Sequence, residues 1–201
     1  MSEAQKNKEH KIHALLQKRW SPRAFDANQP VSQQDLHSCL EAARWAPSCF
    51  GAEPWRFIVC HKENNQEAWV KLLACLAPKN QEWAQFAPVL LMVCAHQVFE
   101  HNGRDNNWAE YDAGAASISL CLQATALGLV THQMGGFDAE AVCDSFAIPK
   151  DFKPMAAMAL GYQGDVNQLD KDFQSIEVSH RRRKPLAELI FDGAWEPTQG
   201  I

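Results

Sequence analysis

The sequence predicts a domain in which helices cover a β-sheet, in either an α/β or an α+β arrangement. Segments typical of helices and strands alternate along 201 residues, a length that suits one domain with a sizeable core. Hydrophobic residues make up 46% of the chain and charged residues 21%, as in ordinary globular proteins. The chain contains no repeat and no low-complexity linker. We therefore expect a single domain over residues 1–201.

Two helices are expected before the first strand. Residues 9–19 carry apolar side chains on one helical face, and the helix must end before Pro22. The second helix is expected to begin at the N-cap Ser32, because Asp35 then stands at the third helical position, as in a capping box. Pro47 stops this helix.

Strands and helices then alternate. Residues 55–61 are β-branched and aromatic, which favours a strand, whereas residues 65–77 repeat apolar side chains at helical spacing. The nearly continuous apolar run 87–96 predicts a strand that is buried on both faces. Residues 108–129 form the longest helical pattern, and Gly128 fits its C-cap.

The longest helix carries a stripe of small residues, and two more strands follow it. The stripe consists of Gly114, Ser117 and Cys121. Because small side chains let another backbone come close, we expect this helix to be central or to lie at a subunit contact. Residues 129–133 and 154–165 are interpreted as strands, with a helix between them. A short helix is expected in the tail, between Pro185 and Gly193.

Composition limits the function classes. The net charge of −5 and the pI near 5.9 argue against general binding of nucleic acid or of an anionic membrane, because both require a basic face. No run approaches the ~20 apolar residues of a membrane span. The first residues lack the apolar region of a secretory signal. The seven cysteines form no C-x-x-C pair, so we expect reduced thiols in the cytoplasm.

Cations gather in two segments of this acidic chain. The stretch KRWSPRAF occupies residues 18–25, and three consecutive arginines occupy residues 181–183. Each set could be a solvated charged face, which is the commoner role of such a run. Each could also bind a phosphate, because the planar guanidinium group matches phosphate oxygens. Charge alone leaves both interpretations open.

Other catalytic motifs are absent or weak. The chain has no P-loop, no G-x-G-x-x-G and no G-x-S-x-G. His96 and His101 do not have the spacing of a known metal motif, so no metal site is predicted. We do not expect Cys49 to act as a nucleophile, because it follows the C-terminal end of a helix, which does not stabilise a thiolate. We expect His132 to be a strand residue rather than a base.

Taken together, four segments resemble the nitroreductase family of FMN-dependent oxidoreductases. The strongest signature is R-x-S-x-R at residues 19–23, followed by A-P-S-x-x-x-x-x-P-W-x-F at residues 46–57. The helix that ends near Gly128 precedes MGGFD, and RRRKPLAELIF follows near the C-terminus. The order and spacing match over nearly the whole chain.

The resemblance implies one FMN site that both ends of the chain help to build. It assigns the FMN phosphate and ribityl chain to Arg19, Ser21, Arg181 and Arg183, with Trp20 in the same segment. Arg23 would approach the pyrimidine end of the flavin, where a cation favours the negative charge of the reduced ring. Asn80 would place its amide against the pyrimidine edge.

Further contacts follow from the same resemblance. The backbone of Gly135 and Gly136 would face the N5 side of the flavin. A loop that lies along the flavin from the partner subunit matches Pro47, Ser48, Cys49 and Gly51. Phe50 and Trp83 would shape an acceptor pocket. Most family members have Asn where Gly51 stands and Gln where Glu53 stands, which affects the role of this loop and the choice of substrate.

The implied fold is α+β and nitroreductase-like, with a mixed, mainly antiparallel sheet flanked by helices. The implied assembly is a homodimer with FMN at the interface, in which the tail, about residues 180–201, crosses to the partner. The implied activity passes hydride from NAD(P)H through flavin N5 to a nitroaromatic, a quinone or a flavin, in a ping-pong cycle. A flavin-binding carrier or sensor without turnover is the alternative, and an interaction module for an acidic partner is a second one.

Overall fold

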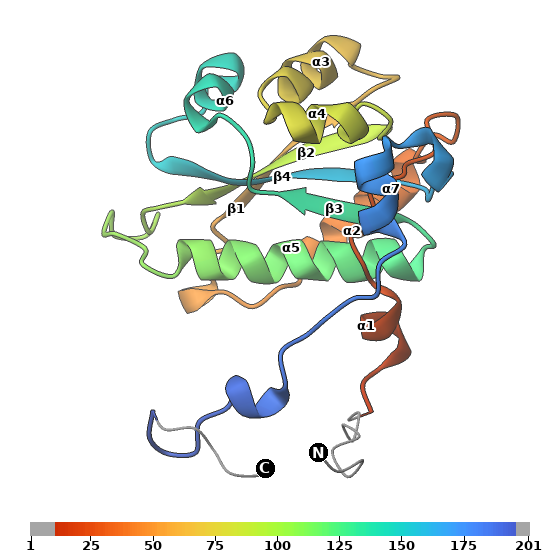
Figure 1. Cartoon of the computed structure of the whole chain (residues 1–201). Coiled ribbons are helices and arrows are strands. Elements are labelled where there is room, and N and C mark those ends of the chain that lie inside the picture. Colours follow the sequence, from red (N-terminus) through yellow and green to blue (C-terminus); the bar gives the residue numbers. More distant parts are fainter. Residues whose placement is uncertain (1–10, 196–201) are drawn as a thin grey trace, which may run out of the picture.

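A four-stranded sheet forms the centre of the fold (Figure 1). The computed structural model describes residues 11–195. The strands are β1 (Trp55–His61), β2 (Val89–His96), β3 (Val130–Met134) and β4 (Phe152–Gly161), in the order β1-β2-β4-β3. The three pairings are antiparallel, which confirms the predicted mainly antiparallel sheet. Within the described residues, no parallel strand joins the sheet.

Strand β2 shows why its sequence is almost continuously apolar. Leu90 and Met92 belong to the core on one face of the sheet, whereas Leu91 and Val93 belong to the core on the other. Successive side chains of a strand point to opposite faces, so a strand that is covered on both sides needs an apolar residue at every position. The prediction of a strand buried on both faces is confirmed.

Helices cover both faces of the sheet (Figure 1). Helices α3 (Gln66–Ala74), α4 (Pro78–Ala84) and α6 (Ala139–Phe146) lie on one face. Helices α2 (Gln33–Arg44) and α5 (Ala109–Ala126) lie on the other, where α5 runs the length of the sheet. The helix-covered sheet that the alternating pattern predicts is therefore present.

The N-cap of α2 is the residue that the sequence predicts, whereas the first helix is shorter than predicted. The Ser32 hydroxyl accepts the Asp35 N–H at 3.0 Å, so Ser32 is the predicted N-cap. Helix α1 spans Ala14–Lys18 rather than residues 9–19, because His13 caps it by accepting the Leu15 N–H. Residues 9 and 10 lie outside the described part.

Two short helices were not predicted, and the tail helix is shorter than expected. Helices α4 and α7 (Lys171–Glu177) have seven residues each, too few to repeat an apolar stripe. The tail forms one 3₁₀ turn over Leu186–Glu188, which ends well before Gly193. The tail continues away from the sheet in Figure 1, and residues 196–201 of the predicted crossing segment lie outside the described residues.

The connection after β4 brings the C-terminal part back to the N-terminal segment. A Cβ atom at Gly164 would lie 2.5 Å from the backbone C and O atoms of Phe25, so glycine is needed where the two segments meet. The seven cysteines all lie in the described part and are free thiols. Within residues 11–195, no helix is long and apolar enough to cross a membrane.

Candidate functional site

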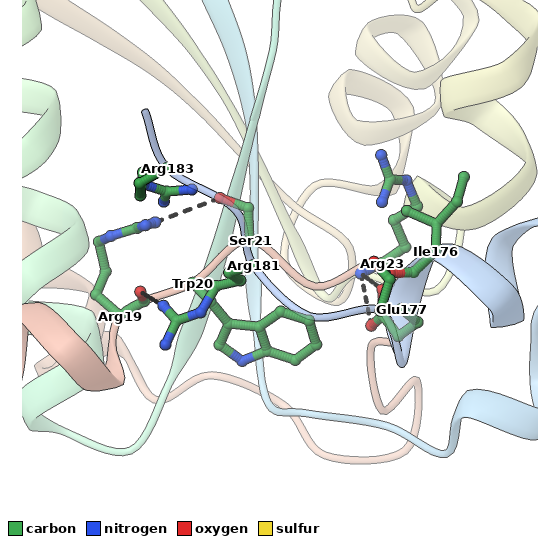
Figure 2. A pocket seen from close by; sticks show the side chains of 9 residues that line it. Arg19, Trp20, Ser21, Arg23, Ile176, Glu177, Arg181 and Arg183 are labelled. Carbon is green, nitrogen blue, oxygen red and sulfur yellow. Dashed lines mark hydrogen bonds between the residues drawn. The ribbon is translucent and has the colours of Figure 1, made fainter. Parts of the chain in front are cut away.

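A cavity of about 210 Å³ lies between the segment after α1 and the segment around the end of α7 (Figure 2). It is lined by Arg19, Trp20, Ser21, Arg23, Ile176, Glu177, Ser179, Arg181 and Arg183. Six of these residues were predicted to bind a cofactor. The fold thus brings together the two cationic segments, which are more than 150 residues apart in the sequence.

Arginine–carbonyl hydrogen bonds hold one end of the cavity. The Arg181 guanidinium donates to the carbonyl of Arg19 at 2.8 Å and to the carbonyl of Gln17 at 2.6 Å. Arg19 donates to the Ser21 hydroxyl at 3.3 Å, and Arg183 donates to the carbonyl of its neighbour Arg182. Arg19, Ser21, Arg181 and Arg183 gather at this end in Figure 2.

In the part of the chain that the structure describes, these arginines have no carboxylate partner. Within residues 11–195, none of Arg19, Arg23, Arg181 and Arg183 forms an ion pair, although the chain as a whole is acidic. Four arginines line this one small cavity, and their guanidinium groups repel one another unless an anion joins them. The cavity therefore has the chemistry of a site for a phosphate or a similar anion.

Arg23 lies at the other end of the cavity (Figure 2). Its main-chain N–H donates to both oxygens of Glu177, at 2.9 and 3.0 Å. Its guanidinium carbon lies 5.6 Å from the centroid of the Phe173 ring, and the Lys79 ammonium of α4 lies equally far from the same centroid. The Arg23 side chain therefore points toward α4 and away from Arg19.

Helix α4 also brings Asn80 to the glycine pair Gly135–Gly136, a contact that the sequence did not predict. The Asn80 amide donates to the carbonyl of Gly136 at 2.9 Å, and the Ala77 N–H donates to the same carbonyl at 2.9 Å. A Cβ atom at Gly136 would lie 2.9 Å from the Asn80 amide nitrogen, so a larger residue there would require the Asn80 side chain to move. A Cβ at Gly135 would meet open space.

The loop of residues 47–51 does not join this cavity within one chain. Its Cys49 N–H donates to the Asp112 carboxylate at 2.9 Å, which fixes the loop at the beginning of α5. Figure 1 shows this orange segment at the opposite end of α5 from α1 and α7. Pro47, Ser48, Cys49, Phe50 and Gly51 are therefore absent from the lining of the arginine cavity.

The 47–51 loop presents an aromatic side chain in an uncommon backbone conformation. Phe50 has φ 55° and ψ 20°, and its side chain is 84% exposed. A left-handed conformation is unfavourable for a bulky residue. Its ring makes edge contacts with Phe99 and His101. The Ser48 hydroxyl accepts the Glu53 N–H at 3.0 Å, which closes the loop.

Trp83 does not line the cavity. Its side chain is 1% exposed, and it lies in the core against Phe25 and His132. An indole so enclosed cannot touch an acceptor directly. Its predicted place in an acceptor pocket therefore disagrees with its burial, because α4 turns this residue toward the sheet.

His132 supports the arginine segment from the sheet. Its Nδ1 lies 2.9 Å from the carbonyl of Pro22, which can only accept, so Nδ1 carries the proton. The pKa of His132 is lowered to about 4, mainly by burial and to a smaller extent by the nearby charge of Arg23, while the hydrogen bond to the Pro22 carbonyl opposes the shift. The expected strand histidine is thus neutral and structural.

The sequence did not reveal Ile176, Glu177 and Ser179. They belong to the end of α7 and the residues after it, a helix too short to show a pattern. The spacing of Phe173 and Ile176 was the one available signal of a helical face. Among residues 11–195, no group of three or more His, Cys, Asp or Glu side chains could hold a metal ion.

Comparisons with known proteins agree on one family. The model of the nitroreductase family matches residues 16–162. A crystal structure described as an oxidoreductase containing FMN superposes with a TM-score of 0.88 and 36% identity, over 94% of this chain and 96% of that chain. An uncharacterised 15.4 kDa protein of Mycolicibacterium smegmatis is 35% identical, over 61% of this chain and 82% of that protein. "Putative NAD(P)H nitroreductase YdgI" of Bacillus subtilis is 25% identical, over 75% and 88%.

The His132 environment predicts a pH-dependent stability. The pKa is about 4 in the folded chain and about 6.5 when unfolded, so between these values the unfolded chain binds more protons. The free energy of unfolding should therefore fall as the pH drops from 6.5 to 4, by up to about 3 kcal/mol from this residue. Urea unfolding across this range checks it. His132→Gln should show a correspondingly shallower loss; an unchanged pH profile would contradict the assignment.

Proposed function

The chain belongs to the nitroreductase family, and we propose on this premise that it is an FMN-dependent oxidoreductase that uses NAD(P)H. The observation that carries the proposal is the cavity in which arginines from two distant segments meet and, among residues 11–195, form no ion pair with a carboxylate. The FMN of the superposed oxidoreductase and the name of YdgI support the cofactor and the electron donor. We also propose a cytoplasmic location, which suits seven free thiols.

The residues present fit the phosphate end of FMN. Sites for whole cofactors usually measure about 300–1,000 Å³, so a cavity of about 210 Å³ suits the phosphate and part of the ribityl chain. Arg19, Arg181 and Arg183 would neutralise the phosphate, and the Ser21 hydroxyl would add a hydrogen bond. Trp20 lines the same cavity. The flavin ring would then lie outside this cavity.

Residues on and around α4 would contact the flavin ring of FMN. Arg23 would meet the pyrimidine edge, with the Asn80 amide beside it and the backbone of Gly135 and Gly136 near N5. When bound, FMN supplies hydride transfer from NAD(P)H to an acceptor such as a nitroaromatic, a quinone or a free flavin, in two alternating half-reactions. The protein orients the ring and places a cation near it. We assign no residue as a catalytic acid or base.

A homodimer would complete the site. Helix α5 and its N-cap residue expose three apolar side chains on the outer face, away from the sheet: Trp108, Tyr111 and Ile118. The tail exposes Leu186, Leu189 and Trp195. Apolar surface of this extent is typical of a subunit contact. We propose that α5 packs against its symmetry mate, that the tail crosses to the partner, and that the 47–51 loop, with Phe50 at its acceptor pocket, reaches the partner's flavin.

The proposed function has a direct test. The purified protein should show a flavin absorbance spectrum after incubation with FMN and should oxidise NADH or NADPH when an acceptor is present. An anaerobic screen of nitroaromatics, quinones and flavins would then identify the acceptor. A protein that takes up no flavin would contradict the proposal. One that binds FMN without turnover would instead be a carrier or a sensor.

Loss of one phosphate-binding arginine should weaken FMN binding. We expect Arg19→Ala and Arg183→Ala each to cost roughly 1.5–3 kcal/mol of binding free energy, the scale of a charge-assisted hydrogen bond. Fluorescence titration with FMN measures it. Lys71→Ala is the control, because Lys71 forms a surface ion pair with Glu67 on α3 and lines neither the cavity nor the 47–51 loop. Wild-type affinity in both cavity variants would make these arginines surface charges.

Arg23→Ala should lower the reduction potential of the bound flavin. The variant removes a cation that favours the negative charge of the reduced ring, and a loss of about 1.4 kcal/mol corresponds to ~30 mV for two electrons. Arg19→Ala should leave the potential nearly unchanged. A redox titration of both variants with excess FMN compares them. An unchanged potential in Arg23→Ala would refute this division of roles even if FMN binds.

A charge on the outer face of α5 should break the dimer. Ile118 is 42% exposed on this face, and Ile118→Asp should shift the protein toward monomer, because a buried unpaired carboxylate is costly. Val70→Asp, on α3 and 50% exposed, is the matched control and should remain dimeric. Sedimentation velocity at micromolar concentration measures both. A wild-type protein that sediments as an FMN-loaded monomer would rule out the dimer.

A further inference from the structure

Glu177 is the one carboxylate among the nine residues that line the arginine cavity. It is the last residue of α7, and only 8% of it is exposed. Within the described part of the chain, its carboxylate forms no ion pair with the arginines around it. A negative charge here opposes the binding of any anion in the same cavity. An interaction of the Glu177 carboxylate that helps the site would offset this unfavourable charge.

The Glu177 carboxylate is committed to the backbone of the arginine segment. It accepts the Arg23 N–H on both oxygens, at 2.9 and 3.0 Å, and the Ala24 N–H at 3.0 Å. The dashed lines in Figure 2 show the Arg23 bonds. Hydrogen bonds from main-chain N–H groups stabilise a buried carboxylate and fix its donors in place. Glu177 thus sets the orientation of the backbone at Arg23.

This backbone orientation determines where the Arg23 side chain can reach. Glu177 holds the Arg23 N–H (Figure 2). The Arg23 guanidinium lies over the Phe173 ring, with its carbon 5.6 Å from the ring centroid. Arg23 is thereby separated from the arginines at the phosphate end. An amide at position 177 could not hold the N–H in the same way, because its NH₂ group would face the Arg23 N–H, donor against donor.

We propose that Glu177 is a positioning residue that aims Arg23 at the flavin ring and keeps it from the phosphate. This inference rests on the proposed function, since it concerns the ring end of the same FMN site. It makes α7 part of the cofactor site: the helix delivers Glu177 to the Arg23 backbone, and the residues directly after it deliver Arg181 and Arg183 to the phosphate end. Glu177 acts through Arg23 and not by touching the cofactor.

A double-mutant cycle on FMN affinity tests the proposal. The variants are Glu177→Gln, Arg23→Ala and the pair together, measured by fluorescence titration. Loss of the Glu177 charge changes its repulsion of the FMN phosphate equally in the wild-type protein and in Arg23→Ala. This direct effect on FMN affinity therefore cancels in the cycle. The remaining coupling reports action through Arg23. We expect a coupling of about tenfold, the lower end of what one charge-assisted hydrogen bond provides. The midpoint potentials should be non-additive as well.

A matched control separates positioning from general loosening. Gln168 donates to the Phe25 carbonyl and so clamps the same segment, but it does not line the cavity. Gln168→Ala should lower stability without changing FMN affinity or showing coupling to Arg23→Ala. If Glu177→Gln does not fold, Glu177→Asp, which keeps the charge but shortens its reach, enters the same cycle.

The outcomes distinguish this inference from the proposed function. Coupling below twofold, in a wild-type protein that binds FMN and oxidises NAD(P)H, overturns the role of Glu177 and leaves the function intact. Equal coupling in the Gln168→Ala cycle overturns it too, because the effect would then be general loosening. A wild-type protein that takes up no FMN refutes the proposed function itself.

Discussion

The docking of the segment after α7 onto the segment after α1 is the contact on which the site depends. Arg181 binds the carbonyls of Gln17 and Arg19, while Glu177 binds the N–H groups of Arg23 and Ala24. Side chains from one end of the chain thus satisfy backbone groups of the irregular segment at the other end. Without this contact, the cationic residues would be two unrelated surface runs.

The same contact concentrates positive charge in an acidic protein. A net charge of −5 offers many carboxylates, yet in the described part the cavity arginines are left without one, and the single carboxylate among them binds main-chain N–H groups. This distribution keeps the attraction for an anion local. An acidic exterior and a local cationic cavity are therefore compatible in one small domain.

Helix α5 separates the two halves of the predicted site. The arginine cavity lies near one end of the helix, and the 47–51 loop is fixed near the other by the bond between Cys49 and Asp112. A rigid helix keeps them apart within one chain. In the proposed dimer, contact between two α5 helices would bring the loop of one protomer to the cavity of the other and would bury the apolar side chains that α5 exposes.

The sequence by itself determined where the strands and the main helices form, and it identified the two cationic segments as candidates for binding an anion. These features could be predicted because apolar spacing, helix caps and charge are local properties of the chain. The alternating burial of β2 and the Ser32 cap follow directly from such patterns. Tertiary structure alone decided which side chains meet. It buried Trp83 in the core, and it brought Glu177 to Arg23 across more than 150 residues. A single carboxylate in a short helix has no signature in the sequence, since its partners are backbone N–H groups that every residue except proline possesses.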